Sequence, residues 1–125
     1  MIAKQFGAST IGLGNKGLTD HDATVVAEIL KSNTSVTAVW LSDNKEIGDE
    51  GAKALAEALK VNATVEKLHL EDCGIGDDGA AAIAEALRSN TSLKYLGLMD
   101  NGIGEKGKQL LRDAAAGREG FDLSV

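Results

Sequence analysis

The sequence contains no proline, one cysteine and few aromatic residues, and each shortage limits what the chain can be. Without proline, helices can run without interruption, and the 15 glycines provide the turns. One cysteine cannot form an internal disulfide, so nothing indicates an oxidising compartment. Aromatic residues make up only 3% of a chain that is 43% hydrophobic. Small and aliphatic side chains must therefore fill the core.

Long apolar runs and an excess of basic charge are also lacking. No apolar stretch approaches the ~20 residues of a membrane helix, and the first residues show no basic segment followed by an apolar run and a cleavage site. The net charge of −6 disfavours nucleic acid and anionic membranes as partners. We therefore expect a cytoplasmic protein that forms a single domain over residues 1–125 and binds neither nucleic acid nor a membrane.

What the sequence does contain is an internal repeat. Ile47, Ile75 and Ile103 follow one another at a spacing of 28 residues, and Leu18 precedes the first by 29. The pattern around these anchors reads Val36-x-x-Val39-x-Leu41-x-x-Asn44, Val65-x-x-Leu68-x-Leu70-x-x-Cys73 and Leu93-x-x-Leu96-x-Leu98-x-x-Asn101, with a weaker copy in Ile11-x-Leu13-x-x-Lys16-x-Leu18. The alternating apolar residues in each copy predict a short strand with one buried face.

Each predicted strand is followed by a helical pattern. Ala52, Leu55 and Leu59 stand at i, i+3 and i+7, and the next repeat carries the same stripe. Every helix is expected to open on a capping residue followed by an acid, at Thr19-Asp20, Gly48-Asp49, Gly76-Asp77 and Gly104-Glu105. At the helix ends, a left-handed backbone is expected for Asn33, Asn62 and Asn90.

A single unit cannot bury both its strand and its helix stripe, but stacked units can. Over roughly residues 11–116 the sequence resembles leucine-rich-repeat proteins of the ribonuclease-inhibitor type, and also the repeats of NOD-like receptors and of the Ran GTPase-activating protein. The resemblance implies an α/β fold, a right-handed β/α leucine-rich-repeat solenoid of about four repeats with a parallel concave sheet and convex helices. We expect residues 1–18 to form an N-terminal capping unit, 19–116 the repeats, and 117–125 a degenerate C-terminal strand or cap.

The repeats depart from their own pattern at four places. Lys16 stands where two later copies have asparagine, and Cys73 takes that place in the third copy. Because the family uses either Asn or Cys there, to hydrogen-bond the neighbouring turn, Cys73 is interpreted as a buried structural thiol. Lys45-Glu46 adds one residue and predicts a local bulge. The alternating tail 121–125 predicts an extra strand, whose open edge makes a homodimer through the C-terminal end possible.

The usual signatures of catalysis are weak or missing. Gly74-x-Gly76-x-x-Gly79 and Gly102-x-Gly104-x-x-Gly107 match the dinucleotide-binding fingerprint, but Asp77 and Asp78 put negative charge where a phosphate would lie. The glycines are therefore interpreted as packing residues of the strand–helix turn. Neither histidine pairs with cysteine at metal-ligand spacing, and no catalytic triad or carboxylate pair stands out. We predict no catalytic residue, no metal and no cofactor, and conclude that the chain is not an enzyme.

The strand residues that point away from the core form the candidate binding site. The only Trp and the only Tyr of the chain both fall on this concave face. Trp, Tyr and Met are enriched at protein interfaces. The predicted protein-binding residues are Trp40, His69, Tyr95, Met99, Lys67 and Glu71. An acidic row at the strand exits, formed by Asp43, Asp72 and Asp100, favours a basic partner.

Two alternative functions stay open from the sequence. The chain is either a piece of a larger NOD-like sensor or regulator, whose repeats restrain a neighbouring domain, or a GTPase-activating regulator, as the resemblance to the Ran protein permits. A repeat scaffold of this kind does not by itself identify its partner.

Overall fold

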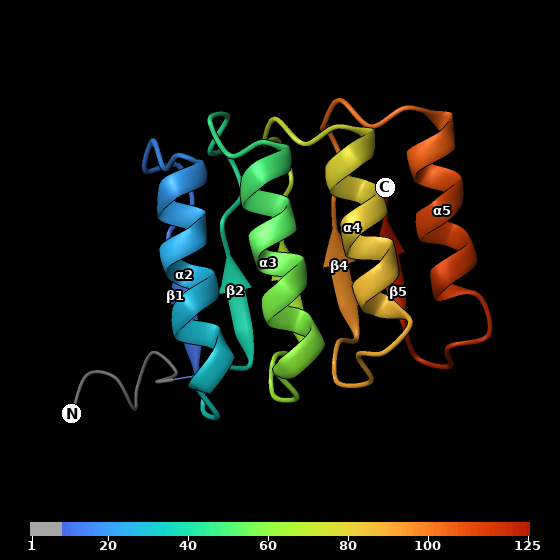
Figure 1. The fold of residues 1–125 in the computed structure, drawn as a ribbon, viewed down its shortest axis with the longest axis horizontal. Helices are drawn as coiled ribbons and strands as arrows, with labels where there is room; N and C mark the ends of the chain where they lie inside the picture. Colours follow the sequence, from blue (N-terminus) through green and yellow to red (C-terminus); the bar gives the residue numbers. More distant parts are fainter. Residues whose placement is uncertain (1–8) are drawn as a thin grey trace.

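The computed structural model describes residues 9–125, which form a single row of strand–helix units (Figure 1). The elements in chain order are β1 (Thr10–Gly12), α2 (Asp20–Ser32), β2 (Ala38–Trp40), α3 (Asp49–Val61), β3 (Lys67–His69), α4 (Asp77–Leu87), β4 (Tyr95–Gly97), α5 (Glu105–Ala115) and β5 (Asp122–Ser124). The strands form one sheet in the order β1-β2-β3-β4-β5, and each neighbouring pair is parallel. Helices α2 to α5 stand side by side over one face of that sheet. This confirms the predicted solenoid of about four repeats.

The core lies between the sheet and the helices. Strand pairing aligns equivalent repeat positions, so that Val39 lies beside Leu68 and Leu68 beside Leu96. All three side chains are buried, as are the apolar faces of α3 and α4. Because every repeat presents the same positions inward, stacking joins them into one continuous core.

The helices begin at the predicted capping residues, each followed by an acid in the first turn, but their N-termini are satisfied in different ways. Only α2 is capped by its own side chain, where Thr19 Oγ1 accepts from the N–H of Asp22. The other three helices follow glycines, which have no side chain to cap with. Asp20 of α2 serves α3 instead: its Oδ1 accepts from the N–H groups of Gly48 and Gly51 at 2.7 and 2.9 Å. The first-turn acids therefore tie each repeat to the next.

The contacts between neighbouring repeats, which we call the seams, also explain the glycine motifs. The N–H groups of Gly76 and Gly79 donate to Oδ1 of Asp49 at 2.7 and 2.9 Å. A Cβ on Gly79 would lie 2.7 Å from that same oxygen and 2.9 Å from Cβ of Ala52. The donors that a phosphate would need are occupied by a carboxylate, which supports the packing interpretation.

The expectation of a left-handed backbone at the helix ends was wrong. Asn33 and Asn62 are extended, with φ of −80° and −88°. Asn62 is buried, where its Nδ2 donates to the carbonyl of Leu30 and its Oδ1 accepts from the N–H of Val65, both at 2.8 Å. Two later residues stand in the equivalent place and also donate to carbonyls of the preceding repeat, Asn90 and Arg118. We call Asn62, Asn90 and Arg118 the helix-exit ladder.

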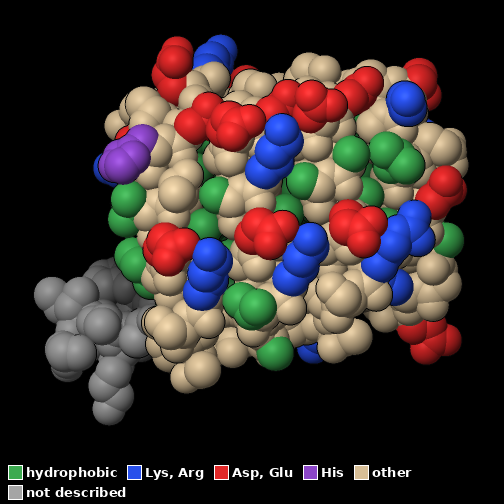
Figure 2. Space-filling view, viewed as in Figure 1, with side chains coloured by type: hydrophobic (Ala, Val, Ile, Leu, Met, Phe, Trp, Pro, Cys, Tyr) green, Lys and Arg blue, Asp and Glu red, His purple; other side chains and the backbone are tan. Residues whose placement is uncertain are grey.

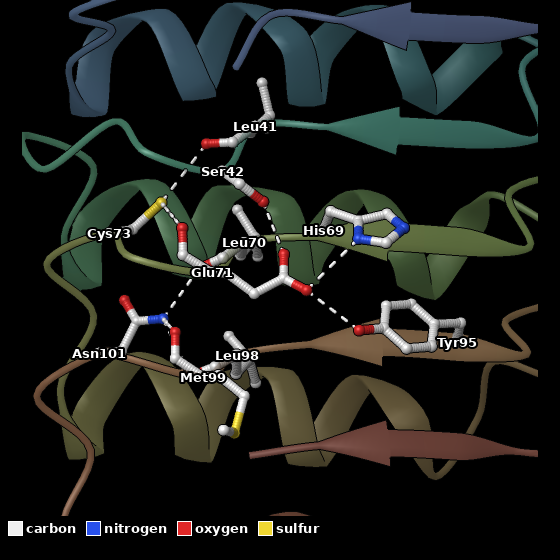
Figure 3. Close-up of polar contacts among 10 residues, drawn as sticks. All are labelled: Leu41, Ser42, His69, Leu70, Glu71, Cys73, Tyr95, Leu98, Met99 and Asn101. Carbon is white, nitrogen blue, oxygen red and sulfur yellow. Dashed lines mark hydrogen bonds and ion pairs between the residues drawn. The ribbon is translucent and has the colours of Figure 1, made fainter. Parts of the chain in front are cut away.

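A second ladder follows the strands and includes the cysteine. Asn44 donates to carbonyls of its own and the preceding repeat and accepts two backbone N–H groups. Cys73 Sγ donates to the carbonyls of Leu41 and Glu71 at 3.5 and 3.7 Å (Figure 3). The N–H of Ile47 bonds to the carbonyl of Asn44 in its own longer loop, so that N–H does not need an acceptor from residue 73. Burial raises the pKa of the Cys73 thiol to about 11, which agrees with a structural role.

The C-terminal tail forms the predicted extra strand. β5 pairs with β4, and Phe121, Leu123 and Val125 lie partly buried against the core. β5 is the last strand of the sheet, and within the described part of the chain no strand pairs with its outer edge. Homodimerisation through that edge and the capping roles of residues 1–18 and 117–125 remain predictions, and residues 1–8 lie outside the described residues.

The convex face carries ion pairs along its helices. Figure 2 shows acidic side chains gathered where the helices begin and acidic–basic pairs across their middle. The helices carry the ion pairs Lys31–Glu28 in α2, Lys53–Glu50 at the start of α3 and Lys60–Glu57 toward its end, each three residues apart. Exposed pairs of this kind contribute ~0–1 kcal/mol each. The convex face therefore has the character of a solvated surface.

Candidate functional site: the concave sheet face

Alternate strand residues build the concave face, because successive side chains in a strand point to opposite sides. The register of the sheet sets them in rows across the strands. One row contains Gly12, Trp40, His69 and Gly97, and the next contains Thr10, Ala38, Lys67 and Tyr95. Neighbouring residues in a row lie within reach of each other's side chains.

The aromatic residues of these rows touch. The rings of Trp40 and His69 are stacked, with centroids 3.7 Å apart and planes 8° apart. His69 also packs on Tyr95, at 4.6 Å and a tilt of 32°. Trp40 nevertheless remains 43% exposed. The stack therefore holds a large ring in a fixed orientation at the surface, which lowers the entropy that a partner would lose on binding.

Glu71 holds this cluster from the strand exit. One carboxylate oxygen accepts from the Tyr95 hydroxyl at 3.0 Å and lies 3.4 Å from Nδ1 of His69, and the other accepts from the Ser42 hydroxyl at 2.6 Å (Figure 3). Burial alone would raise the pKa of Glu71, but the hydrogen bonds from Ser42, its own backbone N–H and Tyr95, together with the field of His69, lower the pKa below its ordinary value. The ionised carboxylate is thus the favoured form.

The pKa of Tyr95 is shifted in the opposite direction. Burial, followed by its hydrogen bond to Glu71, raises the pKa of the Tyr95 hydroxyl. The phenol therefore stays a proton donor to the carboxylate. These directions agree with each other, because a neutral donor beside an ionised acceptor is the arrangement that both shifts stabilise.

Gly97 provides the room for Glu71. A Cβ at this position would collide with the Glu71 carboxylate and lie 2.8 Å from the Tyr95 hydroxyl. Sequence reasoning placed Gly97 and Ser42 on this face but did not count either as part of the site. The signal for Gly97 was present, since a glycine inside a strand often marks the close approach of another group.

The six predicted site residues do not all meet. Trp40, His69, Tyr95 and Glu71 form one contact cluster. Met99 is 45% exposed on the loop after β4, and Lys67 is exposed in the row that contains Tyr95. These two residues border the cluster.

The acidic row lies at the exits of the strands. Asp43, Asp72 and Asp100 adopt left-handed backbones with φ of 65°, 52° and 63°. The hydrogen bond between Asp43 and Asp72 raises the pKa of Asp43, with smaller contributions from partial burial and from the charges of Asp72 and Glu71. Lys45 lies 3.9 Å from Asp72. The charge of Lys45 also opposes the rise in the pKa of Asp43, so the row combines adjacent carboxylates with one lysine beside them.

The side chains gathered on this face are aromatic rings, hydroxyls and carboxylates. Over residues 9–125, no group of three His, Cys, Asp or Glu side chains is arranged to hold a metal ion. Nor does any helix of that range have the length and apolar character to cross a membrane. Every buried side-chain nitrogen or oxygen of the described residues has a hydrogen-bond partner. What the face offers a ligand is an exposed, fixed aromatic ring beside carboxylates.

Comparisons with known proteins agree with this architecture. Two solved structures superpose on nearly the whole chain. The actin-binding site 2 of leiomodin-1 matches with a TM-score of 0.81 and 25% identity, covering 93% of this chain and 69% of that one. The tropomodulin C-terminal domain of Caenorhabditis elegans matches with a TM-score of 0.82, covering 94% and 72%, but at 12% identity it shows the fold alone. No curated protein gives a significant match.

A family model adds direct sequence support. The model described as "Leucine Rich repeat" matches residues 32–56, 61–84 and 89–111, which together exceed half of the chain. These segments each run from the end of one helix through the strand into the next helix. With its repeated strand–helix units, single parallel sheet and two polar ladders, the chain belongs to the leucine-rich-repeat family, in the form typical of the ribonuclease inhibitor.

Proposed function

We propose that this chain is a protein-recognition module that binds its partner on the concave sheet face. The single observation that carries the proposal is the exposed Trp40 ring, held flat on His69 at 3.7 Å. Trp and Tyr dominate binding hot spots because they bury much area for little entropy. His69, Tyr95 and Glu71 complete the cluster around Trp40, and Met99 and Lys67 at its border extend the anchoring surface.

The polarity of the face favours a partner with basic groups. The chain has a net charge of −6, and the acidic row Asp43, Asp72 and Asp100 lies beside the aromatic cluster. Complementary charge would speed association and select among partners more than it would add affinity.

Affinity capture with matched variants tests the concave site. Trp40→Ala and Tyr95→Ala should weaken capture of a retained protein by about 2 kcal/mol or more. The controls Lys53→Glu and Arg88→Glu reverse charge on or beside the convex helices and should leave capture unchanged. If the controls abolish capture and the aromatic variants do not, the interface lies on the convex side and the proposal is wrong.

Actin is a second, more specific candidate partner. Its support is the likeness to leiomodin-1, whose matching part is described as an actin-binding site. Co-sedimentation with filamentous actin and gel filtration with monomeric actin test it directly. Binding that is lost in Trp40→Ala would join the two proposals, whereas no binding to either form of actin leaves only the general one.

A further inference from the structure

The uncovered side of the Trp40 ring supports an inference that rests on the proposed role of the concave face. His69 covers one face of the indole. On the opposite side the register places Gly12 of β1 directly beside Trp40. Apart from Gly12 and its two chain neighbours, no described residue has an atom within 4 Å of a Cβ built on Gly12. Among the described residues, the second face of the ring therefore borders an open space, which we call the Gly12 site.

The shape of the Gly12 site favours a flat group. Its wall is the planar indole, and its floor is the backbone of an exposed glycine in the edge strand. The nearest neighbours in the adjoining row are Thr10 and Ala38, which are also small. A planar side chain can lie against the ring here without displacing a side chain of residues 9–125.

The charges around the site favour a cation. Asp43 follows Trp40 by three residues and lies in the turn after β2. Asp72 is the next carboxylate across the strand exits and interacts with Asp43, and Lys45 balances part of this charge from 3.9 Å away from Asp72. A guanidinium group stacked on the indole has N–H groups in its own plane, so they can point along the ring toward these carboxylates.

Arginine combines the two requirements better than lysine does. Its guanidinium is planar, stacks on aromatic faces and donates in a fork to carboxylates, whereas the lysine ammonium is a compact point charge. We propose that the open face of Trp40 over Gly12 is an arginine-binding position, which receives one arginine side chain from an extended basic segment of the partner protein while Asp43 pairs with its guanidinium.

The fluorescence of Trp40, the only tryptophan, reports occupancy of this position directly. The probe is the capped peptide Gly-Arg-Gly-Arg-Gly, titrated beside two matched peptides that carry lysine or citrulline in place of arginine. We expect a saturable change in emission with the arginine peptide, roughly 3- to 10-fold weaker binding of the lysine peptide, and no response to citrulline, which has the shape of arginine without its charge.

Filling the site with a side chain gives the sharpest variant. Gly12→Val places a β-branched residue in β1, where its Cβ meets no described side chain, so the protein should fold with an unchanged melting temperature and lose the arginine response. The matched control is Thr10→Val, which changes the same strand and side at the neighbouring position and should bind as the wild type does. Asp43→Asn should weaken binding and reduce its dependence on salt.

Two results would overturn the proposal: equal affinity for the arginine and lysine peptides, or arginine binding that survives Gly12→Val. Its failure is distinct from failure of the proposed function. If partner capture depends on Trp40 but the arginine peptide gives no response, the concave interface stands and the arginine position is wrong. If the peptide responds but Trp40→Ala captures its partner as well as the wild type does, the arginine position stands and the concave interface for that partner is wrong.

Discussion

The seams between repeats and the concave face both contain satisfied polar groups, but they are organised differently. In the seams the same bonds recur with the repeat: Asn62 and Asn90 donate to equivalent carbonyls of the preceding repeat. On the concave face, the bonds from Ser42 and Tyr95 to Glu71 occur once in the described part of the chain. Stacking requires the recurring bonds but not the single cluster. The recurring residues therefore serve the fold, and the single cluster is free to serve recognition.

The largest expected effect separates these two kinds of bond. Asn62→Leu would leave the carbonyl of Leu30 and the N–H of Val65 buried without partners. We expect a loss of ~2–4 kcal/mol in the free energy of unfolding, measured by urea denaturation. The matched change on the concave face is Tyr95→Phe, which removes one part-buried bond and should cost ~0.5–1.5 kcal/mol. Equal losses would remove the distinction between seam and surface.

Two glycines sharpen the same comparison. Gly79→Ala places a methyl group 2.7 Å from Oδ1 of Asp49 and 2.9 Å from Cβ of Ala52, so overpacking should destabilise the protein by ~1–3 kcal/mol. Gly12→Ala meets no described atom and should be neutral or stabilising by up to ~1 kcal/mol. Helix propensity alone would make Gly79→Ala favourable. A stabilised Gly79→Ala variant would therefore show that the seam is loosely packed.

The concave cluster should also respond to pH. Because the folded-state pKa of Glu71 is lowered, its ionised form stabilises the fold above the ordinary value of 4.5, and this contribution is lost as the pH falls through the lowered folded value. Glu71→Gln should therefore be less stable than the wild type at pH 7, and the two should converge in acid. Urea titrations at both ends of this range measure the difference. A difference that does not change with pH would mean that the charge of Glu71 contributes nothing.

The period of the sequence predicted the fold because repetition constrains structure strongly. Once Val39, Leu68 and Leu96 occupy equivalent positions, parallel stacking in register is the arrangement that buries all of them. Alternation within each strand then placed Trp40, His69 and Tyr95 on the face away from the helices. That reasoning needs only the side on which each residue lies, which sequence does encode.

The details that were missed are contacts between repeats. Asp49 was interpreted as supporting its own helix, whereas its carboxylate binds Gly76 and Gly79 of the next repeat. Asn62 was interpreted by its local conformation, whereas it acts on the repeat before it. The period shows which positions are equivalent but not which atoms of neighbouring repeats meet. The space that Gly97 leaves for Glu71 is hidden for the same reason, since the two residues belong to neighbouring repeats and meet only after stacking.

The smallest expected effect concerns the acidic row. The pKa of Asp43 is raised, chiefly by its hydrogen bond with Asp72 and then by partial burial and like charge, so ionising Asp43 costs stability above the ordinary value of 3.8. Asp43→Asn should therefore be slightly more stable than the wild type at pH 7 in low salt, and this gain should disappear in high salt or in acid.

Asparagine suits the left-handed backbone, as Asn15 shows at the equivalent position with φ of 55°. Asp43→Ala is the control, because it removes the same charge but places alanine at a φ of 65°, which should cost ~1–2 kcal/mol. Thermal unfolding of the three proteins should give the order Asn, Asp, Ala from most to least stable. If Asp43→Asn stabilises the protein and also weakens binding of the arginine peptide, then Asp43 lowers stability while it contributes to recognition. The seam residues do the reverse, since they contribute to stability and not to recognition.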